Sequence, residues 1–222
     1  MERILLNKLL EWQKAGRKKP LLLQGARQVG KTYLLKEFGS AYYEDMAYFD
    51  FEKSPGLKDI FSADLTPRII VEKLGLYREK KIAPEHTLIF FDEIQALPNA
   101  LTSLKYFCEQ APEFHLIAAG SLLGVSVGKQ TGFPVGKVNF LTLYPMNFSE
   151  YLIAFNEDLL LEALTQITII KPIPDILHNK LIQHLKQFLY LGGMPEVLQN
   201  YLDNNDISLM RNIQNELLEA YK

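Results

Sequence analysis

The first two thirds of the chain alternate short apolar runs with longer segments of helical periodicity. Five runs have the length and composition of buried strands: Leu21–Gln24, Ala47–Phe51, Thr87–Phe91, His115–Ala119 and Val138–Leu143. The segments between them with helical spacing are Thr32–Phe38, Thr66–Lys80 and Asn99–Gln110. Strands that alternate with helices are typical of a parallel sheet, because the chain needs a crossover to return to the same edge. The pattern predicts an α/β fold with a five-stranded, mainly parallel sheet.

After about residue 145 only helical periodicity remains. Helices are expected over Ser149–Phe155, Glu157–Gln166, Ile176–Tyr190 and Ile207–Tyr221. The first twelve residues, Met1–Trp12, have an amphipathic pattern that predicts a packing helix. We therefore expect residues 1–145 to form a core with an N-terminal packing helix, and residues 146–222 to form an all-α domain. The last helical pattern continues to Lys222 without a C-cap glycine, so we expect a further C-terminal domain after it.

Composition and charge narrow the possible functions. A hydrophobic content of 48% and a charged content of 23% are ordinary for a globular protein, and no apolar run approaches the roughly 18 residues of a membrane span. A net charge of −2 does not support nucleic-acid binding through overall charge, although a local patch stays possible. The single cysteine, Cys108, excludes a disulfide framework and favours the cytoplasm. The four histidines share no metal-ligand spacing, so no zinc site is expected.

A phosphate-binding loop is the most specific feature of the sequence. Residues 25–32 match the pattern G-x-x-x-x-G-K-[ST] and lie between the first predicted strand and a predicted helix, which is the setting that phosphate binding needs. The residues expected to surround the phosphates with backbone N–H groups are Gly25, Ala26, Arg27, Gln28, Val29 and Gly30. Lys31 would reach the β- and γ-phosphates, and the Thr32 hydroxyl would ligate Mg²⁺. The loop predicts a nucleoside triphosphate ligand.

The strand at Leu88–Phe91 ends in Asp92-Glu93, as a Walker B motif does. Asp92 would be the Mg²⁺ partner, and Glu93 would polarise the attacking water. A capping or solvated pair is the alternative for an isolated Asp-Glu. The sequence has no guanine-reading Asn-Lys-x-Asp or Thr-Lys-x-Asp motif, which favours ATP over GTP. Ser121 closes the fourth strand and would sense the γ-phosphate or the lytic water, unless it only caps the turn.

Five segments in order carry a resemblance to a known family: residues 25–32, 91–95, 119–124, 143–152 and 192–197. Together they resemble the AAA_14 family of prokaryotic ATPases within the AAA+ superfamily. The resemblance implies ATP and ADP as ligands, Mg²⁺ as the metal, a helical lid over residues 146–222, and a C-terminal domain of unknown function. It also implies that Gly193 and Pro195, in Gly193-Met194-Pro195, contact the adenine base. A helix break followed by a helix start explains these residues equally well.

One departure from the superfamily concerns the arginine finger that ring-forming members supply from a neighbouring subunit. Residues 121–139 contain Lys129 and Lys137 but no arginine. Lysine lacks the planar, bidentate fork of arginine and is a poor substitute. Arg27 could act in cis or form an outward salt bridge. We therefore expect slow ATP hydrolysis by the isolated chain, with the oligomeric state left open.

The sequence thus favours an AAA+-type ATPase that acts as a nucleotide switch for a C-terminal effector or a protein partner. Two alternatives stay open. One is a superfamily 1 helicase-like fragment that acts on DNA, because Asp92-Glu93-Ile94-Gln95 fits the D-E-x-Q motif, although Gln28-Val29 replaces the expected glycine-rich loop centre. The other is a module that binds ATP without significant hydrolysis.

Overall fold

All five predicted strands form and lie in one sheet, in the order β2-β3-β4-β1-β5. Their bounds are β1 (Leu21–Gly25), β2 (Asp45–Asp50), β3 (Thr87–Asp92), β4 (Leu116–Ser121) and β5 (Asn139–Leu143). The structure is a computed structural model that describes residues 1–16, 18–62, 64–121, 136–166 and 173–220. Neighbouring strands are parallel throughout this sheet, which confirms the predicted α/β class.

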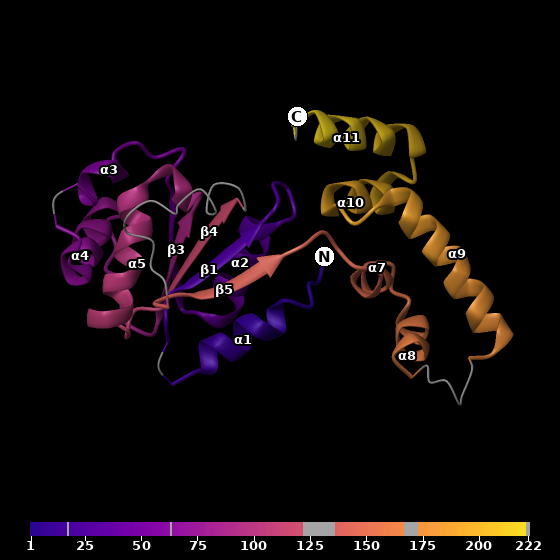
Figure 1. Cartoon of the computed structure of the whole chain (residues 1–222), viewed down its shortest axis with the longest axis horizontal. Coiled ribbons are helices and arrows are strands. Elements are labelled where there is room, and N and C mark those ends of the chain that lie inside the picture. The colour runs from indigo at the N-terminus through magenta and orange to yellow at the C-terminus, as the bar shows by residue number, and fades with distance from the viewer. Residues whose placement is uncertain (17, 63, 122–135, 167–172, 221–222) are drawn as a thin grey trace. The chain divides into compact units, whose positions relative to one another are not determined.

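Helices cover both faces of the sheet, with α1 and α2 on one side and α3, α4 and α5 on the other (Figure 1). Their bounds are α1 (Leu6–Lys14), α2 (Lys31–Tyr42), α3 (Leu57–Ile60), α4 (Pro67–Tyr77) and α5 (Pro98–Gln110). Alternate residues of a strand face opposite sides of a sheet. Phe49, Phe51 and Phe91 accordingly join the core beneath α3–α5, whereas Tyr48 and Phe90 face the other side. This alternation determines which side chains can reach the candidate functional site.

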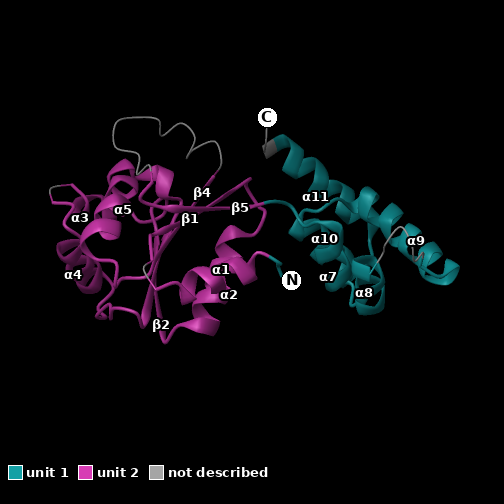
Figure 2. Cartoon of the chain, turned by 60° about the horizontal axis from the view of Figure 1, so that its bottom comes forward, with its two compact units in different colours: residues 1–4, 144–222 teal, residues 5–143 magenta. Residues whose placement is uncertain are grey.

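The chain forms two compact units, Leu5–Leu143 and a second unit that joins Met1–Ile4 to Tyr144–Lys222 (Figure 2). The first four residues lie in the helical unit, whereas the sequence pattern places them in the core with residues 5–145. Arg3 and the backbone N–H of Ile4 both bind the side chain of Glu150. For the same reason the first helix begins at Leu6 and not at Met1 as the pattern predicted.

The second unit is helical. It contains α7 (Phe148–Ala154), α8 (Asp158–Gln166), α9 (Asp175–Leu191), α10 (Pro195–Asn204) and α11 (Ile207–Ala220). Its core is centred on the buried side chains of Tyr151, Leu191 and Met210. A capping box starts α7, since Asn147 and Glu150 bind each other's backbone N–H groups. No helix in the described ranges is long and apolar enough to cross a membrane.

Candidate functional site

The carboxyl ends of four neighbouring strands meet at one edge of the sheet. β1 ends at Gly25, where the phosphate loop begins, and the parallel register places Ser121 of β4 opposite Gly25. β3 and β2 end at Asp92 and Asp50, which are also paired in register. Ligands of open α/β sheets bind outside this edge, where the connections diverge. The predicted residues of β1, β3 and β4 therefore share the edge at which a ligand is expected.

The backbone between β1 and α2 has the shape of a phosphate cradle. Gly30 has a φ of 90° and caps the N-terminus of α2, a conformation that glycine adopts without strain. Gln28 also has a positive φ, 61°, which costs a non-glycine residue about 1–2 kcal/mol. Strain of this kind is typical of ligand-binding loops. The N–H groups at the start of α2 follow directly, so the segment can hold an anionic phosphate.

The side chain of Lys31 folds back over this loop. Its ammonium donates to the carbonyl oxygens of Gly25 at 3.1 Å and Ala26 at 2.8 Å, and the residue is only 7% exposed. Burial lowers the pKa of Lys31, while the nearby carboxylates of Glu93 and Asp92 act to raise it. The amine therefore lies within electrostatic range of both acidic residues. In this position it can exchange its carbonyl partners for phosphate oxygens.

A hydroxyl and a carboxylate lie side by side next to the loop. Thr32 Oγ1 donates to Asp92 Oδ2 at 2.8 Å, and the backbone N–H of Glu93 donates to Asp92 Oδ1 at 3.1 Å. Mg²⁺ prefers hard oxygen ligands and usually combines one or two protein groups with substrate phosphates and water. The donor set fits this requirement, so Thr32 and Asp92 are the residues that can hold the ion.

Glu93 turns the chain away from the sheet directly after β3. It has a φ of 49° and leads into the short 3-10 helix η1 (Ile94–Ala96). Within this turn Gln95 Nε2 donates to Glu93 Oε2 at 2.6 Å. The Glu93 carboxylate is partly exposed, so water can reach it and it can act as a general base.

Two further polar groups reach this site from β2, and the sequence analysis did not find them. The Tyr48 hydroxyl lies 3.1 Å from Oδ2 of Asp92 and 3.4 Å from Oδ2 of Asp50. The run Ala47–Phe51 has the composition of a buried strand, but Tyr48 within it is only partly buried. The available signal was the alternation of polar and apolar residues over 48–51, which places Tyr48 and Asp50 on one side of the strand.

In the helical unit Gly193 lies between α9 and α10, Pro195 begins α10, and both have structural roles. The backbone N–H of Met146 donates to the Gly193 carbonyl at 2.7 Å, and a Cβ on Gly193 would overlap the Met146 backbone. Pro195 is the first residue of α10, a position where its missing N–H is not needed. Neither feature requires a ligand, so contact with adenine stays a prediction.

Comparison with known protein families decides the class of the chain. The profile of the AAA_14 family, described as an AAA domain, matches residues 17–152, which is more than half of the sequence. The chain belongs to the AAA_14 family. No curated protein matches its sequence.

Two solved structures have a similar fold. The Walker-type ATPase PABY2304 of Pyrococcus abyssi has a TM-score of 0.52 and 18% sequence identity, over 97% of this chain and 70% of that one. AMPPCP-bound DnaA from Aquifex aeolicus has a TM-score of 0.50 and 14% identity, over 96% of this chain and 63% of that one. At such identities the likeness shows the fold alone, which is that of a P-loop ATPase followed by a helical region.

Three basic residues were candidates for the role of an arginine finger: Arg27, Lys129 and Lys137. Arg27 lies exposed on the phosphate loop of this AAA_14 protein, whereas Lys129 falls outside the described residues. Lys137 precedes β5 and pairs with Glu109 at 2.9 Å. Because β5 is parallel to β1, Lys137 lies at the amino edge of the sheet. It is therefore at the opposite edge from the phosphate loop of its own chain.

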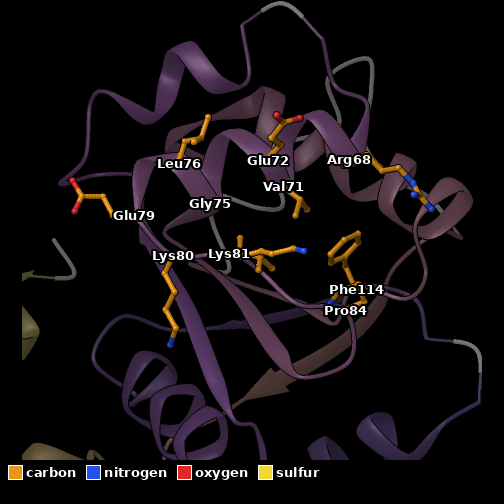
Figure 3. Close-up of a pocket in the computed structure, with 11 residues that line it drawn as sticks. Arg68, Val71, Glu72, Gly75, Leu76, Glu79, Lys80, Lys81, Pro84 and Phe114 are labelled. Atoms are coloured by element: carbon orange, nitrogen blue, oxygen red, sulfur yellow. The ribbon is translucent and has the colours of Figure 1, made fainter.

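A cavity of about 810 Å³ also lies at the amino edge of the sheet (Figure 3). Its walls come from α4 and the segment that leads to β3, with Phe114 just before β4. Val71, Leu76 and Ile82 make much of the lining apolar. The cavity shares no residue with the candidate nucleotide site and lies at the other end of the same strands.

Proposed function

We propose that this AAA_14 protein is a Mg²⁺-dependent ATP hydrolase that acts as a nucleotide switch for a C-terminal effector domain or a protein partner. The observation that carries the proposal is the 2.8 Å hydrogen bond between Thr32 and Asp92. It joins the phosphate loop to the acidic strand, although 59 residues separate them along the chain. Membership of an ATPase family supports the same assignment, and the single cysteine favours a cytoplasmic protein.

The proposed roles follow from the contacts of each side chain. The loop N–H groups and Lys31 bind the phosphates, and Thr32 with Asp92 holds Mg²⁺. When bound, the ion neutralises charge on the β- and γ-phosphate oxygens. Glu93, whose Oε2 is held by Gln95, accepts the proton of the attacking water at its carboxylate. Ser121 contacts the γ-phosphate or that water from the end of β4, and we keep Gly193 and Pro195 as candidates for the adenine contact.

A slow switch is favoured over a fast motor by the absence of arginine between Arg78 and Arg211. An arginine finger contributes about 10³–10⁵ in turnover in the enzymes that use one. The pairing of Lys137 with Glu109 adds no cation to the candidate site of its own chain. We therefore expect turnover by the isolated protein on the order of minutes or longer, as in P-loop enzymes without a finger.

The test is calorimetry of ATP binding with Mg²⁺, together with steady-state hydrolysis. Lys31→Ala should weaken ATP binding roughly 10- to 150-fold, because it removes a charged hydrogen bond to phosphate. Glu93→Gln should still bind ATP but hydrolyse it at least about 100-fold more slowly. The control is Lys58→Ala, which removes an exposed lysine of α3 and should change neither quantity.

The proposal fails if Lys31→Ala binds ATP as tightly as the natural protein. Unchanged hydrolysis by Glu93→Gln would remove Glu93 as the base and leave nucleotide binding intact. Turnover that single-stranded DNA stimulates strongly would favour the helicase alternative.

A further inference from the structure

The Asp92 carboxylate, which we propose holds Mg²⁺, accepts a hydrogen bond from Tyr48 of β2. The proposed function gives this hydrogen bond no role. Asp92 Oδ2 accepts from Thr32 Oγ1 at 2.8 Å and from the Tyr48 hydroxyl at 3.1 Å. Asp92 Oδ1 accepts from the Glu93 backbone N–H at 3.1 Å. Both oxygens of the carboxylate thus accept hydrogen bonds, and two of the three donors share Oδ2.

The strand register places Tyr48 for this contact. Tyr48 of β2 is paired with Phe90 of β3, and Asp50 is paired with Asp92. Residues two apart on a strand face the same side, so Tyr48 reaches Asp92 diagonally across the strand pair. The hydroxyl therefore comes from the neighbouring strand and not from the phosphate loop.

The tyrosine ring is held between two neighbours. Its centroid lies 5.2 Å from that of Phe90, and the Lys36 ammonium of α2 lies 4.1 Å from the ring centroid. A cation over an aromatic face attracts the ring. Contacts from α2 and β3 therefore limit where the hydroxyl can point, and this fixed ring can in turn fix a partner.

The Tyr48 hydroxyl acts as a donor to Asp92. A tyrosine hydroxyl carries its proton at physiological pH, and an ionised carboxylate can only accept a hydrogen bond, so the hydroxyl is the donor of this pair. The shorter of its two contacts is with Asp92 at 3.1 Å, whereas Asp50 lies 3.4 Å away. Asp50 is itself oriented by the backbone, because its Oδ1 accepts from the N–H groups of residues 52 and 53.

We propose that Tyr48 is a positioning residue for Mg²⁺ binding, which fixes the Asp92 carboxylate in the orientation that the metal site needs. This inference rests on the proposed function. Without Tyr48, Oδ2 of Asp92 would be held by Thr32 alone and would lose that hydrogen bond when the Thr32 hydroxyl turns to the ion, whereas the Tyr48 hydrogen bond stays available. Mg²⁺ demands near-ideal octahedral geometry, so the orientation of its protein partner affects its affinity directly.

The test compares Tyr48→Phe with Tyr33→Phe by titrating Mg²⁺ into protein with a fluorescent ATP analogue. Tyr33 is the matched control, because its hydroxyl also binds a carboxylate, that of Glu37 at 2.7 Å, on the exposed side of α2. Tyr48→Phe should raise the half-saturating Mg²⁺ concentration about tenfold, the loss of one hydrogen bond to a charged group. Binding of the analogue in EDTA should not change, and Tyr33→Phe should leave both values unchanged.

A double-mutant cycle separates positioning from a structural role. In an Asp92→Asn background Tyr48→Phe should have no further effect on the Mg²⁺ requirement, because the carboxylate it positions is gone. An unchanged Mg²⁺ requirement for Tyr48→Phe overturns the inference, as does an equal loss in both backgrounds. Either result leaves the proposed function standing if Asp92→Asn alone raises the Mg²⁺ requirement. Failure of the proposed function itself would appear in the natural protein, as binding of the analogue that Mg²⁺ does not affect.

Discussion

Both units contain a carboxylate that is almost completely buried: Asp92 in the α/β unit is 3% exposed and Glu150 in the helical unit is 4% exposed. The negative charges of these two carboxylates are stabilised by different kinds of donor. Glu150 Oε1 accepts from Arg3 Nε at 3.0 Å and from the Ile4 N–H at 2.9 Å, and Oε2 accepts from the Asn147 N–H at 3.1 Å. A buried cation of the same unit therefore neutralises Glu150.

Asp92 is held by neutral donors. It accepts from the hydroxyls of Thr32 and Tyr48 and from the Glu93 N–H. Among the described residues no cation forms an ion pair with it, since the ammonium of Lys31 donates to loop carbonyls. Burying a charge without a partner costs several kcal/mol. The comparison teaches that the charge of Glu150 is balanced by an ion pair, whereas Asp92 has none among the described residues and only the nearby Lys31 ammonium within electrostatic range. We propose that a bound Mg²⁺ balances the charge of Asp92.

The largest expected effect on stability comes from breaking the balanced pair. Glu150→Gln keeps the size of the side chain but removes the carboxylate that neutralises Arg3, which is 6% exposed. Removal of one partner of a buried pair typically costs about 3–5 kcal/mol of unfolding free energy. Hydrogen exchange across residues 148–204 should show this loss in the helical unit.

The control for this variant is Glu157→Gln in the same unit. Glu157 pairs with Lys180 at 2.7 Å, but the lysine side chain is 50% exposed, so the loss should not exceed about 1 kcal/mol. Equal losses in the two variants would contradict the assignment of Glu150 as a buried structural partner.

A smaller effect is expected at Gly193, where the helical unit brings two backbones together. Gly193→Ala should cost about 1–3 kcal/mol of unfolding free energy, because the new Cβ meets the Met146 backbone. Gly16→Ala is the control, since no atom lies within 4 Å of a Cβ built there. Urea unfolding measures both. Unchanged stability of Gly193→Ala with weakened ATP binding would instead assign Gly193 to the nucleotide.

The fold could be predicted from the sequence because hydrophobic periodicity and turn residues indicate the same helices and strands over most of the chain. The strands of the sheet and the helix starts at Pro67 and Pro98 follow from local patterns. The first four residues did not follow, since their amphipathic pattern suits a helix. The contacts of Arg3 and Ile4 with Glu150 keep these residues out of the first helix. Sequence periodicity does not report contacts between residues so far apart.

The site was predictable where a motif fixes both residue type and spacing, as at Lys31, Thr32, Asp92 and Glu93. Tyr48 was not predictable in the same way, because its role depends on the register between β2 and β3. A one-residue shift of that register would turn Tyr48 to the other face and replace it with a phenylalanine. Strand pairing is a tertiary property, so the sequence predicted a buried strand over Ala47–Phe51 but not the contact of the Tyr48 hydroxyl with the Asp92 carboxylate.

The central claim, that Asp92 is left for a cation to balance, is tested most directly by thermal unfolding of Asp92→Asn with and without Mg²⁺ and ATP. Without them, the unfolding free energy should stay within about 1 kcal/mol of that of the natural protein or rise, because the variant removes a buried charge that has no ion-pair partner. With them, the stabilisation that Mg²⁺ adds to ATP binding should be lost. A loss of about 3–5 kcal/mol without ligand, as expected for Glu150→Gln, or an undiminished Mg²⁺-dependent stabilisation, would contradict the account.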